Sequence, residues 1–167
     1  MAVLEEPVDT AERFFRHVLT PNYEQFGSSR TNYAAGFNAA LSAFHMRDWV
    51  FSTMLSEAES YFGCEVKDKV ALWDAVERRL PQAGYVRDIA NASKHFALTH
   101  EPSTGLRQAG EVEIKNFAYG EGTFGSGRFS APDLIIPSPA GDVYFDGCLT
   151  GVYELWRELI YPATSTV

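Results

Sequence analysis

Apolar side chains recur at helical spacing through the first part of the chain, most regularly between residues 32 and 62. Steps of three and four residues connect Tyr33, Phe37, Leu41, Phe44, Asp48, Phe51, Leu55, Ala58 and Phe62. This spacing predicts one long helix with a continuous buried seam that ends at Gly63. Asp48 is a carboxylate in that seam, and a buried carboxylate needs a hydrogen-bonded or charged partner. His45, three residues earlier, lies on the adjacent face and can meet Asp48 directly.

Three other helices are expected before residue 101. The first begins at Asp9 or Thr10 and ends at Pro21, after which a turn-rich stretch leads to Arg30. The other two cover residues 67–80 and 84–99. Each shows apolar residues on one side, as a helix packed against a core requires.

The pattern changes after residue 105. Polar and apolar residues alternate from Glu111, which is typical of a strand with one solvated face. Further strands are expected at 123–130, 133–136 and 143–145, and a final helical stripe comprises Cys148, Leu149, Val152, Leu155, Trp156, Leu159 and Ile160.

The order of these elements predicts an α+β protein, mainly α. About five helices form a bundle, and a small antiparallel β-meander is inserted before the C-terminal helix. Residues 1–167 form a single domain, with helices within 9–100, the meander at about 108–146 and the last helix at about 147–161.

Composition supports a packed globular protein and narrows the function classes. The hydrophobic fraction is 46% and the aromatic fraction 14%, and the formal net charge is −8, which disfavours a broad basic surface for nucleic acid. The N-terminus lacks the pattern of a signal peptide, and no apolar run is long enough to span a membrane. Cys64 and Cys148 lack metal-site or CxxC spacing, so both are expected to be buried, reduced thiols in a cytoplasmic protein.

The predicted helix 84–99 has the densest set of reactive side chains, within the sequence GYVRDIANASKHFALTH. Asp88, Asn91 and His95 fall within an arc of about 60° on such a helix. They are poor helix formers compared with the Glu, Lys and Gln of an ordinary solvated face. Arg87 and Lys94 lie on the outer side of this arc.

Antiparallel bundle helices can place this arc opposite His45 and Asp48, and sites in bundles are commonly built in this way. The residues expected to be catalytic are His45, Asp48, Asp88 and His95. The residues expected to bind a ligand are Arg87, Asn91 and Lys94.

Three interpretations of this constellation remain open. In one, His95 transfers a proton, Asp48 or Asp88 fixes its tautomer, and neighbouring cations bind a phosphate without any cofactor. In another, His45, Asp48, Asp88 and His95 bind a divalent metal. In the third, the same polar residues form a buried network that fixes helix register, and the protein acts as a non-catalytic interaction or structural component.

The segment Arg87-Asp88 followed by His95 resembles the motif of HEPN-domain proteins, in which an Arg, a polar residue and a later His lie on one helix of a small bundle. Seven residues separate Arg87 from His95, whereas the family usually has four to six. The resemblance implies a ribonuclease or nucleotide-binding site, often completed by dimerisation. It therefore implies nucleotide or RNA as the partner, and a homodimer, with site roles for Arg87, Asp88 and His95.

Overall fold

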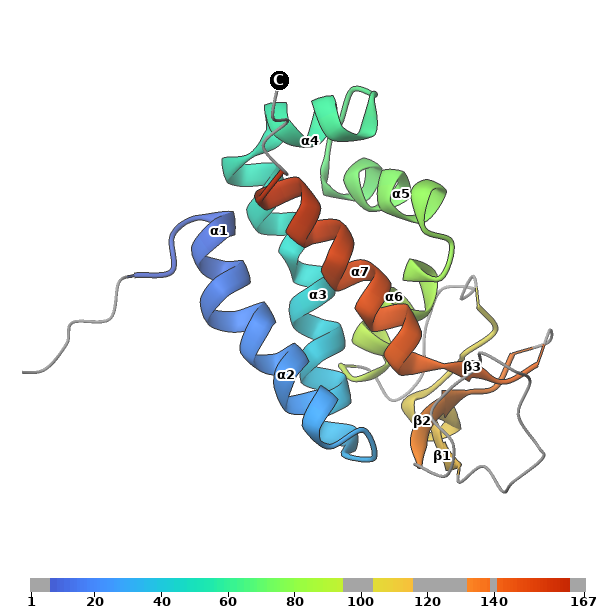
Figure 1. Ribbon diagram of the computed structural model, residues 1–167. Coiled ribbons are helices and arrows are strands. Elements are labelled where there is room, and N and C mark those ends of the chain that lie inside the picture. The colour runs from blue at the N-terminus through green and yellow to red at the C-terminus, as the bar shows by residue number, and fades with distance from the viewer. Residues whose placement is uncertain (1–6, 95–103, 116–131, 139–140, 163–167) are drawn as a thin grey trace, which may run out of the picture.

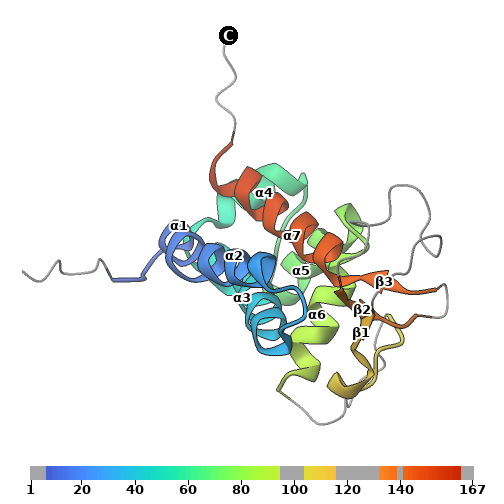
Figure 2. The ribbon, with the colours of Figure 1, turned by 60° about the horizontal axis from the view of Figure 1, so that its bottom comes forward.

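The computed structural model describes residues 7–94, 104–115, 132–138 and 141–162. Helices form most of it, and a small three-stranded antiparallel sheet precedes the last helix (Figure 1). The predicted α+β class, mainly α with a meander before the C-terminal helix, is therefore confirmed. The sheet and the first helix lie at opposite ends of the molecule (Figure 2). In the part of the chain that the structure describes, no helix is both long and apolar enough to span a bilayer.

The chain begins with a continuous helical stretch made of α1 (Ala11–Phe14), η1 (Phe15–Leu19) and α2 (Thr20–Ser28). Thr10 caps its start, because the Thr10 hydroxyl accepts a hydrogen bond from the Arg13 N–H at 3.2 Å. The segment η1 is a π-helical turn, and the Thr20 N–H at its end donates to the carbonyl of Phe15, five residues earlier.

The expected helix stop at Pro21 is wrong, and so is the predicted loop after it, because the helix continues to Ser28. Pro21 lies in the first turn of α2, directly after the π-helical turn. Inside a continuous helix, a proline lacks the N–H for a carbonyl of the preceding turn and its ring crowds that carbonyl, and the wider π-helical turn before Pro21 relieves this crowding. The wide turn and the proline therefore occur together.

Helix α3 (Tyr33–Thr53) lies at the centre of the molecule, behind α7 and between α2 and α6 (Figure 1). Its buried face differs from the predicted seam and consists largely of small residues: Ala35, Gly36, Ala39, Ala40, Ser42 and Ala43, followed by Met46 and Val50. Of the predicted seam within α3, Phe44 is buried, whereas Tyr33 is 40% exposed. The buried face of α3 needs small residues because neighbouring elements approach α3 closely. A Cβ atom on Gly36 would lie 2.7 Å from Leu134 Cδ1 and 3.3 Å from Phe26.

The predicted single helix over 32–62 is broken at Met54, which separates α3 from α4 (Leu55–Phe62). Ser52 and Thr53 turn their hydroxyls back onto carbonyls four residues earlier, at 2.7 and 2.9 Å. Such back-bonding bends and weakens a helix. The predicted end at Gly63 is confirmed, and Gly63 adopts the left-handed conformation with φ +66°.

Helices α5 (Lys69–Arg79) and α6 (Ala83–Ala92) follow. Asp68 caps α5 by accepting from the Ala71 N–H at 2.8 Å. The end of α6 at Ala92 is earlier than the predicted 99, and Ser93 and Lys94 form a turn.

The sheet has the order β1-β2-β3, formed by β1 (Glu113–Lys115), β2 (Asp133–Ile136) and β3 (Val143–Tyr144), and η2 (Ala109–Glu111) precedes it. Both strand pairs are antiparallel, with Ile114 opposite Leu134 and Ile135 opposite Tyr144. The predicted strand 123–130 lies outside the described residues. All four residues of β2 are buried, so the central strand joins the sheet to the helical core.

Helix α7 (Phe145–Ile160) crosses the bundle and closes the core (Figure 1). Its predicted apolar stripe is confirmed, because every member from Cys148 to Ile160 is buried. The indole of Trp156 donates to the carbonyl of Ala43 at 3.0 Å, which ties α7 to the small-residue face of α3.

Candidate functional site

Asp88 is sealed in the core of the described structure, with no exposed surface. One oxygen, Oδ2, accepts from the Thr104 hydroxyl at 2.5 Å and from the Thr104 N–H at 3.2 Å. The other, Oδ1, accepts from Arg87 Nε at 3.1 Å. A buried carboxylate needs such partners, and here they join α6 to the chain that resumes at residue 104.

Arg87 extends this contact to α5. Its Nη1 lies 2.6 Å from Glu77 Oε1, and the same oxygen accepts from the indole of Trp73 at 2.6 Å. We call Trp73, Glu77, Arg87, Asp88 and Thr104 the Asp88 network. Since Arg87 and Glu77 are about one-fifth exposed and Asp88 is fully buried, the network is largely closed to a ligand.

A second group of polar residues lies on the surface, where α3 meets the start of α5 and the end of α6. His45 Nδ1 is 2.9 Å from Asp48 Oδ2, and Lys69 Nζ is 3.2 Å from Asp48 Oδ1. His45 Nε2 is 2.5 Å from Lys94 Nζ. We call His45, Asp48, Lys69 and Lys94 the α3 cluster.

These contacts determine the tautomer of His45. A lysine ammonium can only donate, so Nε2 of His45 accepts from Lys94 and its Nδ1–H donates to Asp48. Nε2 is then the basic nitrogen, and the His45 side chain is 37% exposed. A neutral imidazole oriented by a carboxylate is the arrangement that general bases use.

Neighbouring groups stabilise the negative charge of Asp48. Burial raises the pKa of this carboxyl, but hydrogen bonds from His45 and Lys69 and the nearby positive charges outweigh it. The pKa of Asp48 therefore lies below its usual value, and the carboxylate is ionised at neutral pH.

Arg47 adds a further positive charge beside Asp48. Its guanidinium lies 3.7 Å from the centre of the Phe44 ring, and its Nε is 4.0 Å from Asp48 Oδ1. Burial lowers the pKa of Arg47, Asp48 opposes that effect, and the charge of Arg87 adds to it. Within the described residues the buried Nε of Arg47 has no hydrogen-bond partner.

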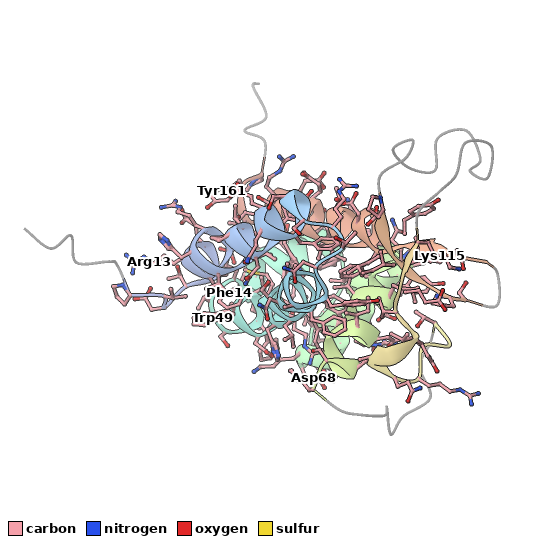
Figure 3. All side chains as sticks on the ribbon, turned by 90° about the horizontal axis from the view of Figure 1, so that it is seen from below. Arg13, Phe14, Trp49, Asp68, Lys115 and Tyr161 are labelled. Carbon is pink, nitrogen blue, oxygen red and sulfur yellow. The ribbon has the colours of Figure 1, made fainter. Side chains whose placement is uncertain are left out.

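The α3 cluster borders an open groove of about 530 Å³ between the first helical stretch and α3. This α2–α3 groove is lined by Phe14, Val18, Asn22, Asn38, Leu41, Ser42, His45, Asp48 and Trp49. Phe14 and Trp49 stack at its end with ring centroids 5.0 Å apart, and Figure 3 shows them side by side. Two of the residues expected to be catalytic, His45 and Asp48, therefore face a cavity.

The structure thus distributes the predicted site residues over two places. His45, Asp48 and Lys94 come together in the α3 cluster, whereas Arg87 and Asp88 belong to the Asp88 network. The expectation that Asp48 lies in a buried seam is wrong, because its side chain is 29% exposed at the margin of the helix. Its partners are His45 and Lys69 on the surface and not Asp88.

Two of the predicted site residues, Asn91 and His95, belong to neither group. Asn91 is half-buried on α6, and no hydrogen bond of its side chain is found within residues 7–94, 104–115, 132–138 and 141–162. His95 lies outside the described residues, so its role stays a prediction.

The interpretation as a metal site finds no group of ligands in the part of the chain that the structure describes. Among the described residues, no three His, Cys, Asp or Glu side chains gather closely enough to hold a metal ion. His45 and Asp48 contact each other, but Asp88 has its own partners. The fourth proposed ligand, His95, is not among the described residues.

Sequence reasoning missed Lys69, Glu77, Trp73 and Thr104. Lys69 had a usable signal, because it follows the helix cap Asp68 and therefore lies at the start of a helix. Thr104 had none, since its contact with Asp88 joins positions sixteen residues apart.

Compared with models of known families, with curated proteins and with solved structures, the chain matches none of them. The resemblance to HEPN proteins therefore stays a prediction.

Proposed function

We propose that the α3 cluster binds a phosphate ester, a nucleotide or RNA, and that His45 exchanges a proton with it. The observation that supports this most is the position of His45 between Asp48 and Lys94, at 2.9 and 2.5 Å. Asp48 holds the imidazole in one tautomer, so Nε2, the nitrogen that contacts Lys94, is the one that can accept a proton.

Charge supports a phosphate as the group that is bound. Lys69, Lys94 and Arg47 all lie around the His45–Asp48 pair in a chain whose net charge is −8. Asp48 neutralises one of these charges, which leaves a local excess of positive charge. Lysine ammonium groups bind phosphate as point charges.

A binding event would also free the base. An incoming phosphate draws the ammonium of Lys94 away from His45 Nε2, because an anionic oxygen is a stronger acceptor than a neutral imidazole nitrogen. Once Lys94 contacts the phosphate, Nε2 is released towards the ligand. In RNA, such a base takes the proton of a ribose 2′-hydroxyl while the 2′-oxygen bonds to the adjacent phosphorus. The bond from that phosphorus to the 5′-oxygen of the next nucleotide breaks, the leaving oxygen takes a proton from water, and a 2′,3′-cyclic phosphate remains.

The test is cleavage of a single-stranded RNA by purified protein and its His45→Ala variant. We expect a loss of about a hundredfold in rate, since general acid–base catalysis contributes roughly 10²–10⁴. His17→Ala is the matched control, because His17 is exposed on η1 and does not line the groove. Equal rates for the wild type and His45→Ala would refute the catalytic role.

Binding is tested separately. Lys69→Ala and Lys94→Ala should each weaken nucleotide binding, whereas Lys115→Ala removes the same charge at the sheet end and should not (Figure 3). Failure of the wild type to bind any nucleotide or RNA in calorimetry would refute the proposal as a whole.

A second candidate function follows from the Asp88 network. Its three hydrogen bonds and full burial favour a role for Asp88 in holding α6 in register, and a non-catalytic interaction protein would need no more. Under this alternative, His45→Ala changes neither binding nor turnover, and Asp88→Ala changes only stability.

The resemblance to HEPN proteins adds a homodimer to the proposal. Sedimentation velocity of the full chain tests it, and a single monomeric species at micromolar concentration would contradict it.

A further inference from the structure

The α2–α3 groove has a defined direction. The first helical stretch and α3 run antiparallel, because the Ala11 N–H donates to Thr53 Oγ1 at 3.0 Å while a Cβ on Gly36 would lie 3.3 Å from Phe26. Phe14, Val18 and Asn22 follow one wall at steps of four residues. The residues of α3 from Asn38 to Trp49 form the other wall, which spans about 16 Å.

Two carboxamide side chains, those of Asn22 and Asn38, lie on opposite walls of the groove. Within the described residues, neither the Asn22 nor the Asn38 side chain makes a hydrogen bond. Ser42 lies one turn from Asn38, and its hydroxyl donates to helix carbonyls, which leaves its oxygen free to accept. A carboxamide offers one acceptor and two donors in a plane, which matches the hydrogen-bonding edge of a nucleobase.

The rest of the groove is suited to a flat, partly apolar group. Val18 and Leu41 supply aliphatic surface, and the stacked rings of Phe14 and Trp49 supply an aromatic end. The volume of about 530 Å³ lies within the range of roughly 300–1,000 Å³ that small-molecule sites occupy. Val18 also belongs to the π-helical turn, a feature found frequently at functional sites.

His45 and Asp48 belong to both the groove and the α3 cluster. Lys69 contacts Asp48 and Lys94 contacts His45, so both lysines lie beside the groove. A ligand that spans both places needs a planar polar group at one end and an anion at the other.

We propose that the ligand of this site is a nucleotide whose base occupies the α2–α3 groove and whose phosphate lies at Lys69 and Lys94. The inference rests on the proposed function, because it takes the α3 cluster as the phosphate site. It adds Asn22 and Asn38 as the residues that recognise the base. A free nucleotide and a nucleotide within an RNA strand share this chemistry.

The first experiment compares ligands with and without a base. Calorimetric titration of the full chain uses the four nucleoside 5′-monophosphates, ribose 5-phosphate and inorganic phosphate. At least one nucleotide should bind about tenfold more tightly than ribose 5-phosphate, the effect of one or two hydrogen bonds to its base. Equal affinities would overturn the groove assignment and leave the phosphate site intact.

The second experiment uses Asn22→Ala/Asn38→Ala. The double variant should lose about tenfold in nucleotide affinity and retain its affinity for ribose 5-phosphate. Gln25→Ala removes an exposed carboxamide on α2 outside the groove lining and is the matched control. An unchanged nucleotide affinity in the double variant would overturn the assignment, and melting curves of all variants show whether they fold.

The fluorescence of Trp49, which lines the groove, shows where the nucleotide binds. Trp73 and Trp156 are buried, so a change in tryptophan fluorescence on nucleotide binding should disappear in Trp49→Phe while calorimetry still detects binding. A fluorescence change that persists in Trp49→Phe would overturn the placement. A trinucleotide that binds more tightly than every monophosphate assigns the site to an RNA strand, and the reverse order assigns it to a free nucleotide.

If neither nucleotides nor ribose 5-phosphate bind, the phosphate site and the inference fall together. If they bind equally and Lys94→Ala weakens both, the phosphate site stands and the inference alone fails.

Discussion

At the scale of single residues, two aspartates with similar expectations have opposite environments. Asp48 is 29% exposed and contacts His45, whereas Asp88 is buried and accepts hydrogen bonds from the backbone N–H and hydroxyl of Thr104. A sequence shows that both are acidic residues on helices, but not which way each helix is rotated. Their roles therefore separate only when their partners are known.

Asp88 should be far more important to stability than Asp48. Asp88→Ala leaves the Thr104 N–H and hydroxyl without their acceptor and Arg87 without one partner, so we expect a loss of about 3–5 kcal/mol in the free energy of unfolding. Urea denaturation monitored by circular dichroism measures it. Asp88→Asn retains an acceptor oxygen and should lose clearly less, and equal losses would contradict the hydrogen-bond explanation.

The two thiols should differ sharply in reactivity. Burial raises the pKa of Cys148 to about 12, so its reactive thiolate is scarce at pH 8, whereas Cys64 is only half-buried, contrary to the expectation that both are buried. A thiol reagent should titrate one equivalent rapidly in the native protein and a second after unfolding. Cys64→Ser should abolish the rapid equivalent, and two rapid equivalents in the wild type would refute the burial of Cys148.

At the scale of elements, the junction of sheet and helices is an ionic contact. Arg30, between α2 and α3, lies 2.7 Å from Asp146 of α7 and 3.5 Å from Asp133 of β2. Burial raises the pKa of Asp133, and the charge of Asp146 adds to this, while Arg30 opposes it. One arginine therefore serves two carboxylates from two elements.

The raised pKa of Asp133 gives a pH prediction with a defined sign. A group whose pKa is higher in the folded state contributes stability below its unfolded value, near 3.8, and loses it as pH rises through the folded value. Asp133→Asn mimics the protonated form and keeps an acceptor for the Leu134 N–H, so it should be more stable than wild type at pH 7. Denaturant titrations between pH 3.5 and 7 should show the difference growing with pH.

Substitution of Arg30, the cation that Asp133 and Asp146 share, is the control for that prediction. Arg30→Gln leaves both carboxylates without it and should cost about 1.5–3 kcal/mol at pH 7, the usual size of hydrogen bonds to charged groups. A difference between Asp133→Asn and wild type that shrinks with rising pH would show that the sign is wrong.

Elements could be predicted from sequence where one face of a helix meets the core. The stripe of α7 and the stop at Gly63 are such cases. The buried face of α3 could not, because α3 has neighbours on several sides and close approach selects its alanines over its aromatic residues. The continuation through Pro21 also depends on a wide turn that no residue pattern announces.

The candidate site was predictable to the same extent. His45 and Asp48 are three residues apart on one helix, and this local spacing alone predicts their contact. The contact between Lys94 and His45 joins residues forty-nine positions apart, and the expectation of facing helices brought them together. The contacts of buried Asp88 come from Thr104, sixteen positions along the chain, which periodicity does not reveal.

At the scale of the whole molecule, a small cationic site lies in a strongly acidic protein. The net charge of −8 repels an anionic ligand at long range, whereas the α3 cluster attracts it only at short range. Salt screens the first effect more than the second, because the Debye length falls from about 30 Å at 0.01 M to about 10 Å at 0.1 M. A basic RNA-binding surface behaves in the opposite way.

The association rate of a nucleotide should therefore rise with salt over this range, by about two- to threefold. Stopped-flow measurement of tryptophan fluorescence at 0.01 and 0.1 M sodium chloride tests this. An uncharged nucleoside should associate at the same rate in both buffers. A nucleotide whose association slows with salt would indicate a positive approach surface that the described charges do not explain.

The π-helical turn over Phe15–Leu19 also acts as a phase shift in the helix that contains it. Because its bond spans five residues in place of four, one residue is looped into the turn, and the chain before it is rotated by about 100° relative to the chain after it. Deleting one residue from this turn would rotate Phe14 away from Trp49 while leaving Phe26 packed under α3. The aromatic end of the groove thus depends on the length of the chain at this point as much as on any side chain in it.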